Sequence, residues 1–148
     1  MRALVQRVTR ASVRVEGETV GETGPGLLVL VAVSVDDGLD EVGGMAAKIL
    51  HLRIFTDENG KMNRSIEDVR GGILLISQFT LYGDVRKGNR PGFELSAPPG
   101  QARPLYESLA SALAATGLSV QTGRFAAHME VELVNDGPVT LQIDMPPV

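Results

Sequence analysis

The stretch LVQRVTRASVRVEGETV, residues 4–20, predicts a fold built on paired β-strands. Its side chains alternate between two faces, with Arg7 beside Val5 on one of them, and a period of two is typical of a strand. The turn Glu16-Gly17-Glu18 then lets the chain fold back on itself. Because Arg7 shares its face with Val5 and Thr9, we expect it to be partly buried and bonded to fixed acceptors such as carbonyl oxygens.

Further along the chain, apolar strands alternate with helical patterns. Residues 27–35 are almost wholly apolar, which is typical of a strand covered on both faces. Apolar residues have helical spacing over residues 39–52 and again from Gln101 or Arg103 to about Thr116. Further strands are expected at residues 53–56, 73–76, 118–122, 129–135 and 139–144. This order predicts the α/β class: a single compact domain over residues 1–148, in which a mixed β-sheet or barrel-like sheets pack against two main helices.

The composition excludes several classes of protein and of site. Hydrophobic residues make up 43% and charged residues 22% of the 148 residues, which is ordinary for a globular domain and excludes disordered, collagen-like and coiled-coil chains. The absence of cysteine excludes disulfides, thiolate nucleophiles and cysteine-based zinc sites. Only two histidines, His51 and His128, are present, so we expect no multi-histidine metal site. We also expect no cofactor.

The charge of the chain limits its partners. The formal net charge is −4, whereas proteins that wrap duplex nucleic acid are strongly basic. The end of an RNA, where few phosphates are touched, is compatible with this charge. No apolar run reaches the roughly 18 residues of a membrane span, and the first ten residues are too charged for a signal peptide, so we expect a cytoplasmic protein that does not bind membranes.

Common hydrolase motifs are absent from the sequence. There is no phosphate-binding G-x-x-x-x-G-K-[ST] loop, no G-x-S-x-G elbow and no H-E-x-x-H. The spacing of His128, Ser77 and Asp136 gives no support to a catalytic triad. A lone histidine at the start of a strand is more often structural.

The first candidate site is the segment SQFTLYGD, which follows the buried strand at residues 73–76. Ligands commonly bind at this end of the strands in α/β sheets. Hydroxyl and amide groups on Ser77, Gln78 and Thr80, together with free backbone N–H groups, could bind a substrate and stabilise an oxyanion. The simpler alternative is a polar loop in which Ser77 and Thr80 bond to the local backbone.

The second candidate is NDGPVT at residues 135–140. Asn-Asp-Gly-Pro between two apolar runs is typical of a hairpin turn. The alternative is a cis peptide bond between Gly137 and Pro138, which would present two carbonyl oxygens in a fixed direction, although only about 5–6% of X–Pro bonds in folded proteins are cis.

The third candidate is a group of three cations, Arg86, Lys87 and Arg90. They lie in a loop over residues 78–104 that is dense in Gly and Pro, and long loops inside a small domain are usually functional or mobile. The group is either part of a solvated loop or a clamp for RNA phosphates and riboses.

Together these segments resemble the D-aminoacyl-tRNA deacylase family, also called the D-tyrosyl-tRNA(Tyr) deacylase family. The similarity spans nearly the whole chain, in the order MRALVQRVTRASVRV, SQFTLYGD, RPGFELSAPP and NDGPVT. SQFTLYGD and NDGPVT resemble the two signature motifs of the family. The family often has glycine where this chain has Ala126, and His128 stands at a variable-looking position.

The resemblance implies a homodimeric editing hydrolase that cleaves the ester between a D-amino acid, or a misplaced glycine, and the terminal adenosine of tRNA. Gly137-Pro138 corresponds to a Gly-cisPro element, which one subunit inserts into its partner's pocket to reject L-amino acids, and Arg7 matches the arginine that tethers it. Residues around the scissile ester correspond to Ser77, Gln78, Phe79 and Thr80. The resemblance also implies chemistry assisted by the 2′-hydroxyl of the tRNA, with Thr80 positioning substrate rather than attacking it.

Two other functions stay open on the sequence alone. One is a related editing domain that removes L-serine from tRNA for threonine, although NDGPVT argues against it. The other is a non-catalytic module that binds RNA ends, since no residue here is an obligate nucleophile. Hydrolysis of D-tyrosyl-, L-tyrosyl- and L-seryl-tRNA by the purified protein would separate all three functions.

Overall fold

The computed structural model describes all residues 1–148 and is built on one mixed sheet of six strands. The long strand β1 (Arg2–Val15) has antiparallel partners on both of its edges. These partners are β2 (Glu18–Thr23), β3 (Gly26–Ala32) and β8 (Glu130–Asp144). The parallel part of the sheet continues from β3 to β6 (Gly72–Ser77) and then to β7 (Val120–Thr122).

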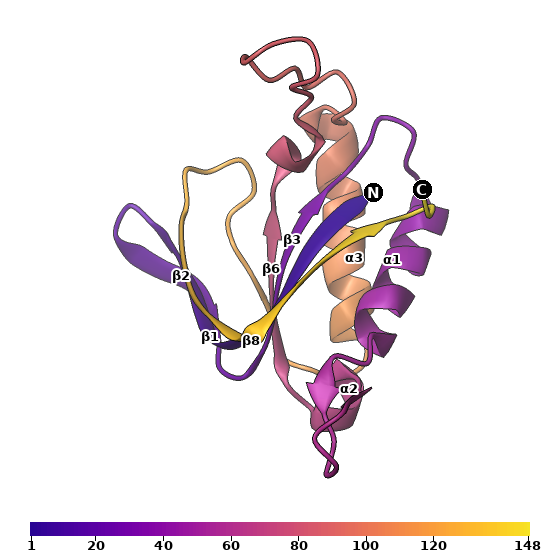
Figure 1. Cartoon of the computed structure of the whole chain (residues 1–148). Helices are drawn as coiled ribbons and strands as arrows, with labels where there is room; N and C mark the ends of the chain where they lie inside the picture. Colours follow the sequence, from indigo (N-terminus) through magenta and orange to yellow (C-terminus); the bar gives the residue numbers. More distant parts are fainter.

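The sheet curls until its two ends almost meet (Figure 1). At the closing edge, the N–H of Glu22 in β2 donates to Oε1 of Gln121 in β7 at 2.8 Å. Gly21 permits this approach, because a Cβ at its position would lie 2.5 Å from the carbonyl oxygen of Thr122. The sheet is therefore nearly closed as a barrel, which confirms the barrel-like arrangement expected from the sequence.

Two long helices, α1 (Leu39–His51) and α3 (Pro99–Ala114), pack against the same side of the sheet (Figure 1). A core of 22 buried apolar residues fills the space between these helices and the sheet. A second cluster of six buried residues lies on the other face of β3 and β6, where the sheet curls over. β3 is thus buried on both faces, as predicted. None of the helices is both long and apolar enough to cross a membrane.

The short elements connect this framework and were mostly not predicted. They are β4 (Phe55–Thr56), β5 (Met62–Arg64), α2 (Ile66–Val69) and the 3₁₀ helix η1 (Phe79–Tyr82). Elements of two to four residues are too short to show a periodic pattern. The predicted strands at 129–135 and 139–144 form the single strand β8, because both stretches pair with β1.

Candidate active site

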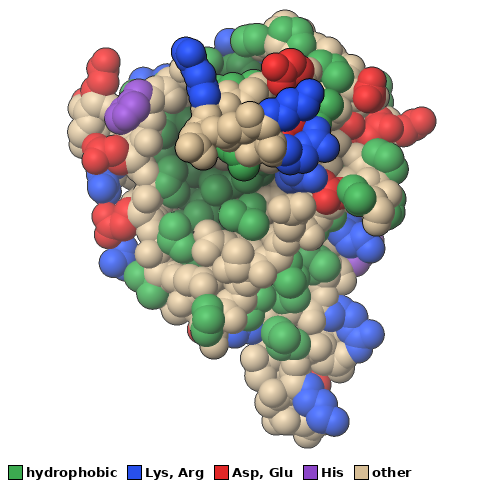
Figure 2. Space-filling view, turned by 45° about the horizontal axis from the view of Figure 1, so that its top comes forward, with side chains coloured by type: hydrophobic (Ala, Val, Ile, Leu, Met, Phe, Trp, Pro, Cys, Tyr) green, Lys and Arg blue, Asp and Glu red, His purple; other side chains and the backbone are tan.

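A cavity of about 450 Å³ lies at the carboxyl end of β6. Eleven of its 15 lining residues are hydrophobic. The lining comes from the ends of β3 and β6, from Phe79, from Ala97 and the start of α3, and from residues 125–131. Figure 2 shows a hollow floored by hydrophobic side chains beneath a loop that is edged by Lys and Arg side chains. Its size and apolar lining are typical of a pocket for a small ligand or one end of a larger one.

The predicted residues Ser77, Gln78 and Phe79 line this cavity. The N–H of Gln78 still bonds to the sheet, donating to the carbonyl oxygen of Val31 at 2.8 Å, and the chain then tightens into η1. The N–H groups of Phe79 and Thr80, at the start of this turn, donate no hydrogen bond within the chain. One of these donors belongs to a residue of the cavity lining and the other to the residue after it, and stabilisation of an oxyanion needs free donors of this kind.

Thr80 is exposed and does not line the cavity. Its hydroxyl oxygen accepts a short hydrogen bond from Nε2 of Gln78, and no carboxylate or imidazole bonds to it. Burial, reinforced by the carboxylate of Asp37, raises the pKa of the nearby Tyr82 to about 12, so this phenol stays protonated at neutral pH. Thr80 therefore lacks the neighbouring base that a hydroxyl nucleophile normally needs.

Ser77, His128 and Asp136 do not form a triad. Ser77 and His128 both line the cavity, but no hydrogen bond joins them, and the carboxylate of Asp136 is paired with Arg7 instead. His128, treated as structural on the sequence alone, is the only ionisable side chain in the cavity lining. No group of three or more His, Asp or Glu residues could hold a metal ion.

The candidate segments of the sequence did not include the cavity wall at residues 125–129. The ring of Phe125 packs against that of Tyr106 with centroids 5.8 Å apart. The guanidinium carbon of Arg103 lies 5.7 Å from the centroid of the same ring. Ala126 has φ of +63°, a backbone conformation that favours glycine. The frequent glycine of the resembling family at this position was the one sequence signal for this turn.

The pairing of β8 with β1 is interrupted at the second candidate segment. Gln6 pairs with Thr140 and Val8 with Asn135, so residues 136–139 stand opposite a single residue of β1. We call residues 136–139 the β8 bulge. Its apex is exposed to solvent and does not line the cavity of its own chain.

Arg7 is the residue of β1 that faces the β8 bulge and holds it. Its Nε donates to the carbonyl oxygen of Asp136 at 3.2 Å, and its Nη1 donates to the carbonyl oxygen of Ile54 at 2.7 Å. Asn135 Nδ2 donates to the carbonyl oxygens of Arg7 at 2.9 Å and Val139 at 3.1 Å, which closes the bulge from its other side. The Arg7 side chain is only 12% exposed, so its predicted partial burial against carbonyl acceptors is confirmed.

The predicted cis bond between Gly137 and Pro138 is wrong for this structure, in which the one cis peptide bond precedes Pro146. Gly137 has φ of +114° and turns the chain with a trans bond, the isomer that X–Pro bonds favour by about 0.5–1 kcal/mol. The hairpin alternative is also wrong, because both sides of NDGPVT pair with the same strand.

The three predicted cations differ in their availability. Nε and Nη2 of Arg86 donate to the carboxylate of Asp84 at 2.9 and 2.7 Å, and this bonding lowers the pKa of Asp84 to about 2. Lys87 and Arg90 are exposed and form no hydrogen bond or ion pair. Only these two are free to bind a ligand without breaking an existing contact.

Comparison with known proteins gives a consistent picture. Residues 4–144 match the family described as D-Tyr-tRNA(Tyr) deacylase. A D-aminoacyl-tRNA deacylase of Ruegeria pomeroyi is 58% identical over 98% of this chain and 100% of its own length. A D-aminoacyl-tRNA deacylase of Deinococcus radiodurans is 57% identical over the same shares of both chains.

Two solved structures have the same fold. A c-Myc DNA unwinding element binding protein superposes with a TM-score of 0.92 at 45% identity, over 97% of this chain and 98% of that chain. A probable eukaryotic D-amino acid tRNA deacylase superposes with a TM-score of 0.81 at 19% identity, over 96% and 97%. The second likeness concerns the fold alone.

Proposed function

We propose that the cavity at the end of β6 binds the aminoacylated end of tRNA, since the chain belongs to the D-Tyr-tRNA(Tyr) deacylase family and is a D-aminoacyl-tRNA deacylase. The proposal rests on the polar groups at the edge of the cavity. There Ser77 and Gln78 supply polar side chains, while Phe79 and Thr80 supply two unbonded N–H donors. The apolar lining suits a side chain or a base at that end of the tRNA.

Hydrolysis at this edge depends on stabilising an oxyanion. A donor aimed at a developing oxyanion contributes roughly 2.7–4 kcal/mol, and an aminoacyl ester is labile enough for such limited assistance. Because Thr80 has no base beside it, we infer that water attacks the ester carbonyl with the help of the 2′-hydroxyl of the terminal adenosine. Gln78 and Thr80, which are bonded to each other, then orient the substrate.

The β8 bulge is our candidate for the element that rejects L-amino acids. Its apex is exposed, Arg7 and Asn135 hold it, and it is absent from the cavity of its own subunit. We infer a homodimer in which each bulge enters the partner's cavity, with its carbonyl oxygens where an L side chain would lie. A D-amino acid and glycine have only hydrogen on that side, so D-aminoacyl-tRNA and mischarged glycyl-tRNA are both cleaved. Such exclusion does not depend on the identity of the side chain.

The remaining contacts with tRNA are assigned to the basic loop. Lys87 and Arg90 are free to bind phosphates, and Arg86 would have to leave Asp84 first. A few such contacts suit a chain with net charge −4. We take residues 1–148 to work as one domain in the cytoplasm, without a cofactor.

Purified protein tests the proposal with four substrates: D-tyrosyl-, L-tyrosyl-, glycyl- and L-seryl-tRNA. We expect the D-tyrosyl and glycyl esters to be hydrolysed and both L esters to be left intact. Rapid release of L-tyrosine would refute rejection by the β8 bulge, and release of L-serine alone would assign the chain to a different editing reaction. Gln78→Ala should lower hydrolysis of both cleaved substrates, and unchanged rates would show that the ester is not bound at this cavity.

A further inference from the structure

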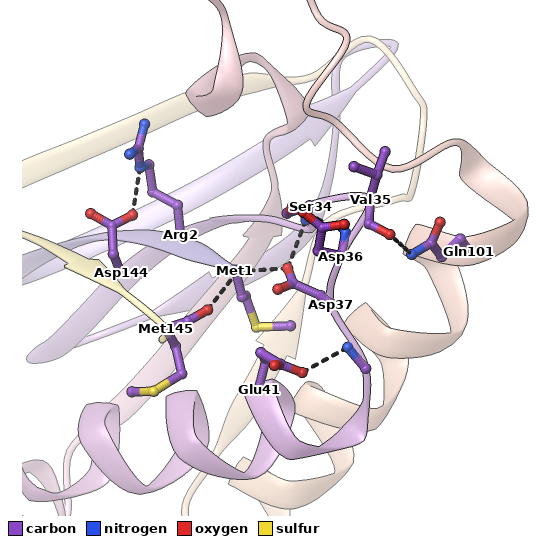
Figure 3. Close-up of polar contacts among 11 residues, drawn as sticks. Met1, Arg2, Ser34, Val35, Asp36, Asp37, Glu41, Gln101, Asp144 and Met145 are labelled. Atoms are coloured by element: carbon purple, nitrogen blue, oxygen red, sulfur yellow. Dashed lines mark hydrogen bonds and ion pairs between the residues drawn. The ribbon is translucent and has the colours of Figure 1, made fainter. Parts of the chain in front are cut away.

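Two walls of the cavity are held from outside by residues that do not line it. The first wall is η1. Nη1 of Arg2 donates to the carbonyl oxygen of Leu81 at 3.2 Å, and its guanidinium carbon lies 5.1 Å from the centroid of the Tyr82 ring. Nε of Arg2 donates to Oδ1 of Asp144 at 2.7 Å (Figure 3). Arg2 therefore connects η1 to the last residue of β8.

The second wall is the segment 33–35, which is fixed by Asp37. Oδ2 of Asp37 accepts from the N–H of Ser34 at 2.7 Å and lies 2.6 Å from the α-ammonium of Met1 (Figure 3). The Asp37 side chain is only 3% exposed and Met1 is fully buried. The same α-ammonium donates to the carbonyl oxygen of Met145 at 2.8 Å. This ion pair thus joins the start of β1, the residue after β8 and the turn before α1.

The two walls are also joined to each other. Ser34 and Ser96 stand opposite each other in an antiparallel β-bridge. Its hydrogen bonds run from the N–H of Ala97 to the carbonyl oxygen of Val33 at 2.9 Å and from the N–H of Val35 to that of Leu95 at 3.0 Å. The hydroxyl of Ser96 donates to the carbonyl oxygen of Phe79 at 3.0 Å. Phe79, Val33 and Ala97 all line the cavity. Asp37 thus fixes one strand of this bridge, and Ser96 on the other strand bonds to the turn that carries the Phe79 and Thr80 N–H groups.

We propose that Arg2 and Asp37 are positioning residues for deacylation, which set the placement of the Phe79 and Thr80 N–H donors through Leu81 and through Ser96. The inference rests on the proposed function, because it takes the cavity to be the place of hydrolysis. A displacement of about 1 Å at a reacting group can lower the rate about a hundredfold. Neither residue lines the cavity, so each acts through the wall that it holds.

The test is steady-state kinetics of D-tyrosyl-tRNA hydrolysis by three variants of the full chain. In Arg2→Leu, the contacts to Leu81, Tyr82 and Asp144 are lost, and we expect kcat to fall about 10- to 100-fold with KM changed much less. Arg2→Lys keeps a cation for Asp144, and it should recover part of kcat. In Ser96→Ala, only the bond to Phe79 is lost, so it should lower kcat by a smaller factor while leaving both ion pairs and the melting temperature nearly unchanged.

Arg10→Leu is the matched control, because Arg10 lies on the same strand and its guanidinium pairs only with exposed Glu132. It should leave kcat unchanged. Asp37→Asn leaves the α-ammonium of Met1 buried without its counter-charge. The kinetics of this variant are therefore interpreted only if circular dichroism shows that it is folded. If it is unfolded, Ser96→Ala tests the same connection to Phe79.

Three outcomes decide the proposal. Loss of kcat in Arg2→Leu and Ser96→Ala, with partial recovery in Arg2→Lys, supports it. Unchanged kcat in both variants while Gln78→Ala is impaired overturns the positioning role and leaves the proposed function standing. Unchanged kcat in all of them, Gln78→Ala included, means that the cavity is not the site of hydrolysis.

Discussion

Thr80 could be taken for a nucleophile, because many hydrolases attack a scissile ester with a hydroxyl group. Its oxygen, however, is bonded to the amide of Gln78 and to no base. We expect Thr80→Ala to lower kcat/KM for D-tyrosyl-tRNA by no more than about tenfold, whereas removing a covalent nucleophile costs several orders of magnitude. Capture of an aminoacyl ester on Thr80 would contradict this expectation.

The role that we infer for the 2′-hydroxyl is tested with tRNA ending in 2′-deoxyadenosine, which we expect to be cleaved slowly.

Arg7 differs from Thr80 in its role, since it touches the β8 bulge and the carbonyl of Ile54 but not the cavity. Arg7→Ala should free the bulge, so we expect L-tyrosyl-tRNA hydrolysis to appear before D-tyrosyl-tRNA hydrolysis is lost. The ratio of the two kcat/KM values is the measurement, with Arg10→Leu on the same strand as the control. A folded Arg7→Ala protein that still rejects L-tyrosine would count against the tether.

The two tyrosines, Tyr82 and Tyr106, give a prediction about pH. Burial is the main cause that raises the pKa of each phenol to about 12, from an ordinary value near 10. Between these values the unfolded chain loses phenolic protons that the folded chain keeps, so stability falls as pH rises from about 10 to about 12. Ultraviolet titration of the folded protein should show no tyrosinate near pH 10, and its appearance there would mean that at least one of the two rings is solvated.

At the scale of elements, the conformation of the β8 bulge depends on Gly137. Its φ is +114°, and a Cβ there would collide with Nη2 of Arg7. Gly137→Ala should therefore lower the free energy of unfolding by at least about 1–2 kcal/mol and weaken rejection of L-tyrosyl-tRNA. Gly43→Ala is the control: Gly43 lies inside α1 with nothing within 4 Å of its Cβ position, so alanine should stabilise the protein by about 0.5–1 kcal/mol. Equal effects of the two changes in urea unfolding would refute the special role of Gly137.

The elements also show which features a sequence can predict. Local periodicity was sufficient for β1, β3, β6 and the two long helices, because each buries a regular face. It was insufficient at NDGPVT, because a hairpin and a bulge use the same turn residues. Which of the two forms depends on pairing with β1, which is distant in the sequence. His128 and Phe125 were missed as cavity residues for the same reason, since it is the curl of the sheet that brings residues 125–131 against the end of β6. SQFTLYGD was identifiable because it directly follows a buried strand.

At the scale of the whole molecule, the arrangement of β8 fits the homodimer that we propose. β8 pairs with β1 alone, so its other edge has unpaired backbone groups along 15 residues. Val131, Val134 and Leu141 on this strand are exposed large hydrophobic residues. The bulge that we assign to L rejection belongs to the same strand, has an exposed apex and does not line its own cavity. A monomer would therefore have an active cavity and a rejecting element that never meet.

Mixing two defective subunits tests this arrangement directly. Gln78→Ala impairs the cavity and leaves the bulge intact, while Gly137→Ala does the reverse. Suppose that each site combines the cavity of one subunit with the bulge of its partner. Adding an equal amount of Gln78→Ala protein to Gly137→Ala protein should then lower L-tyrosyl-tRNA hydrolysis to about half. The reason is that random re-association leaves only half of the Gly137→Ala subunits paired with another Gly137→Ala subunit. D-tyrosyl-tRNA hydrolysis should stay constant, since every cavity of the Gly137→Ala subunits stays active. Sedimentation at micromolar concentration must show dimers in both preparations, and a monomeric enzyme, or L hydrolysis that does not fall on mixing, would place the cavity and the rejecting element in one chain.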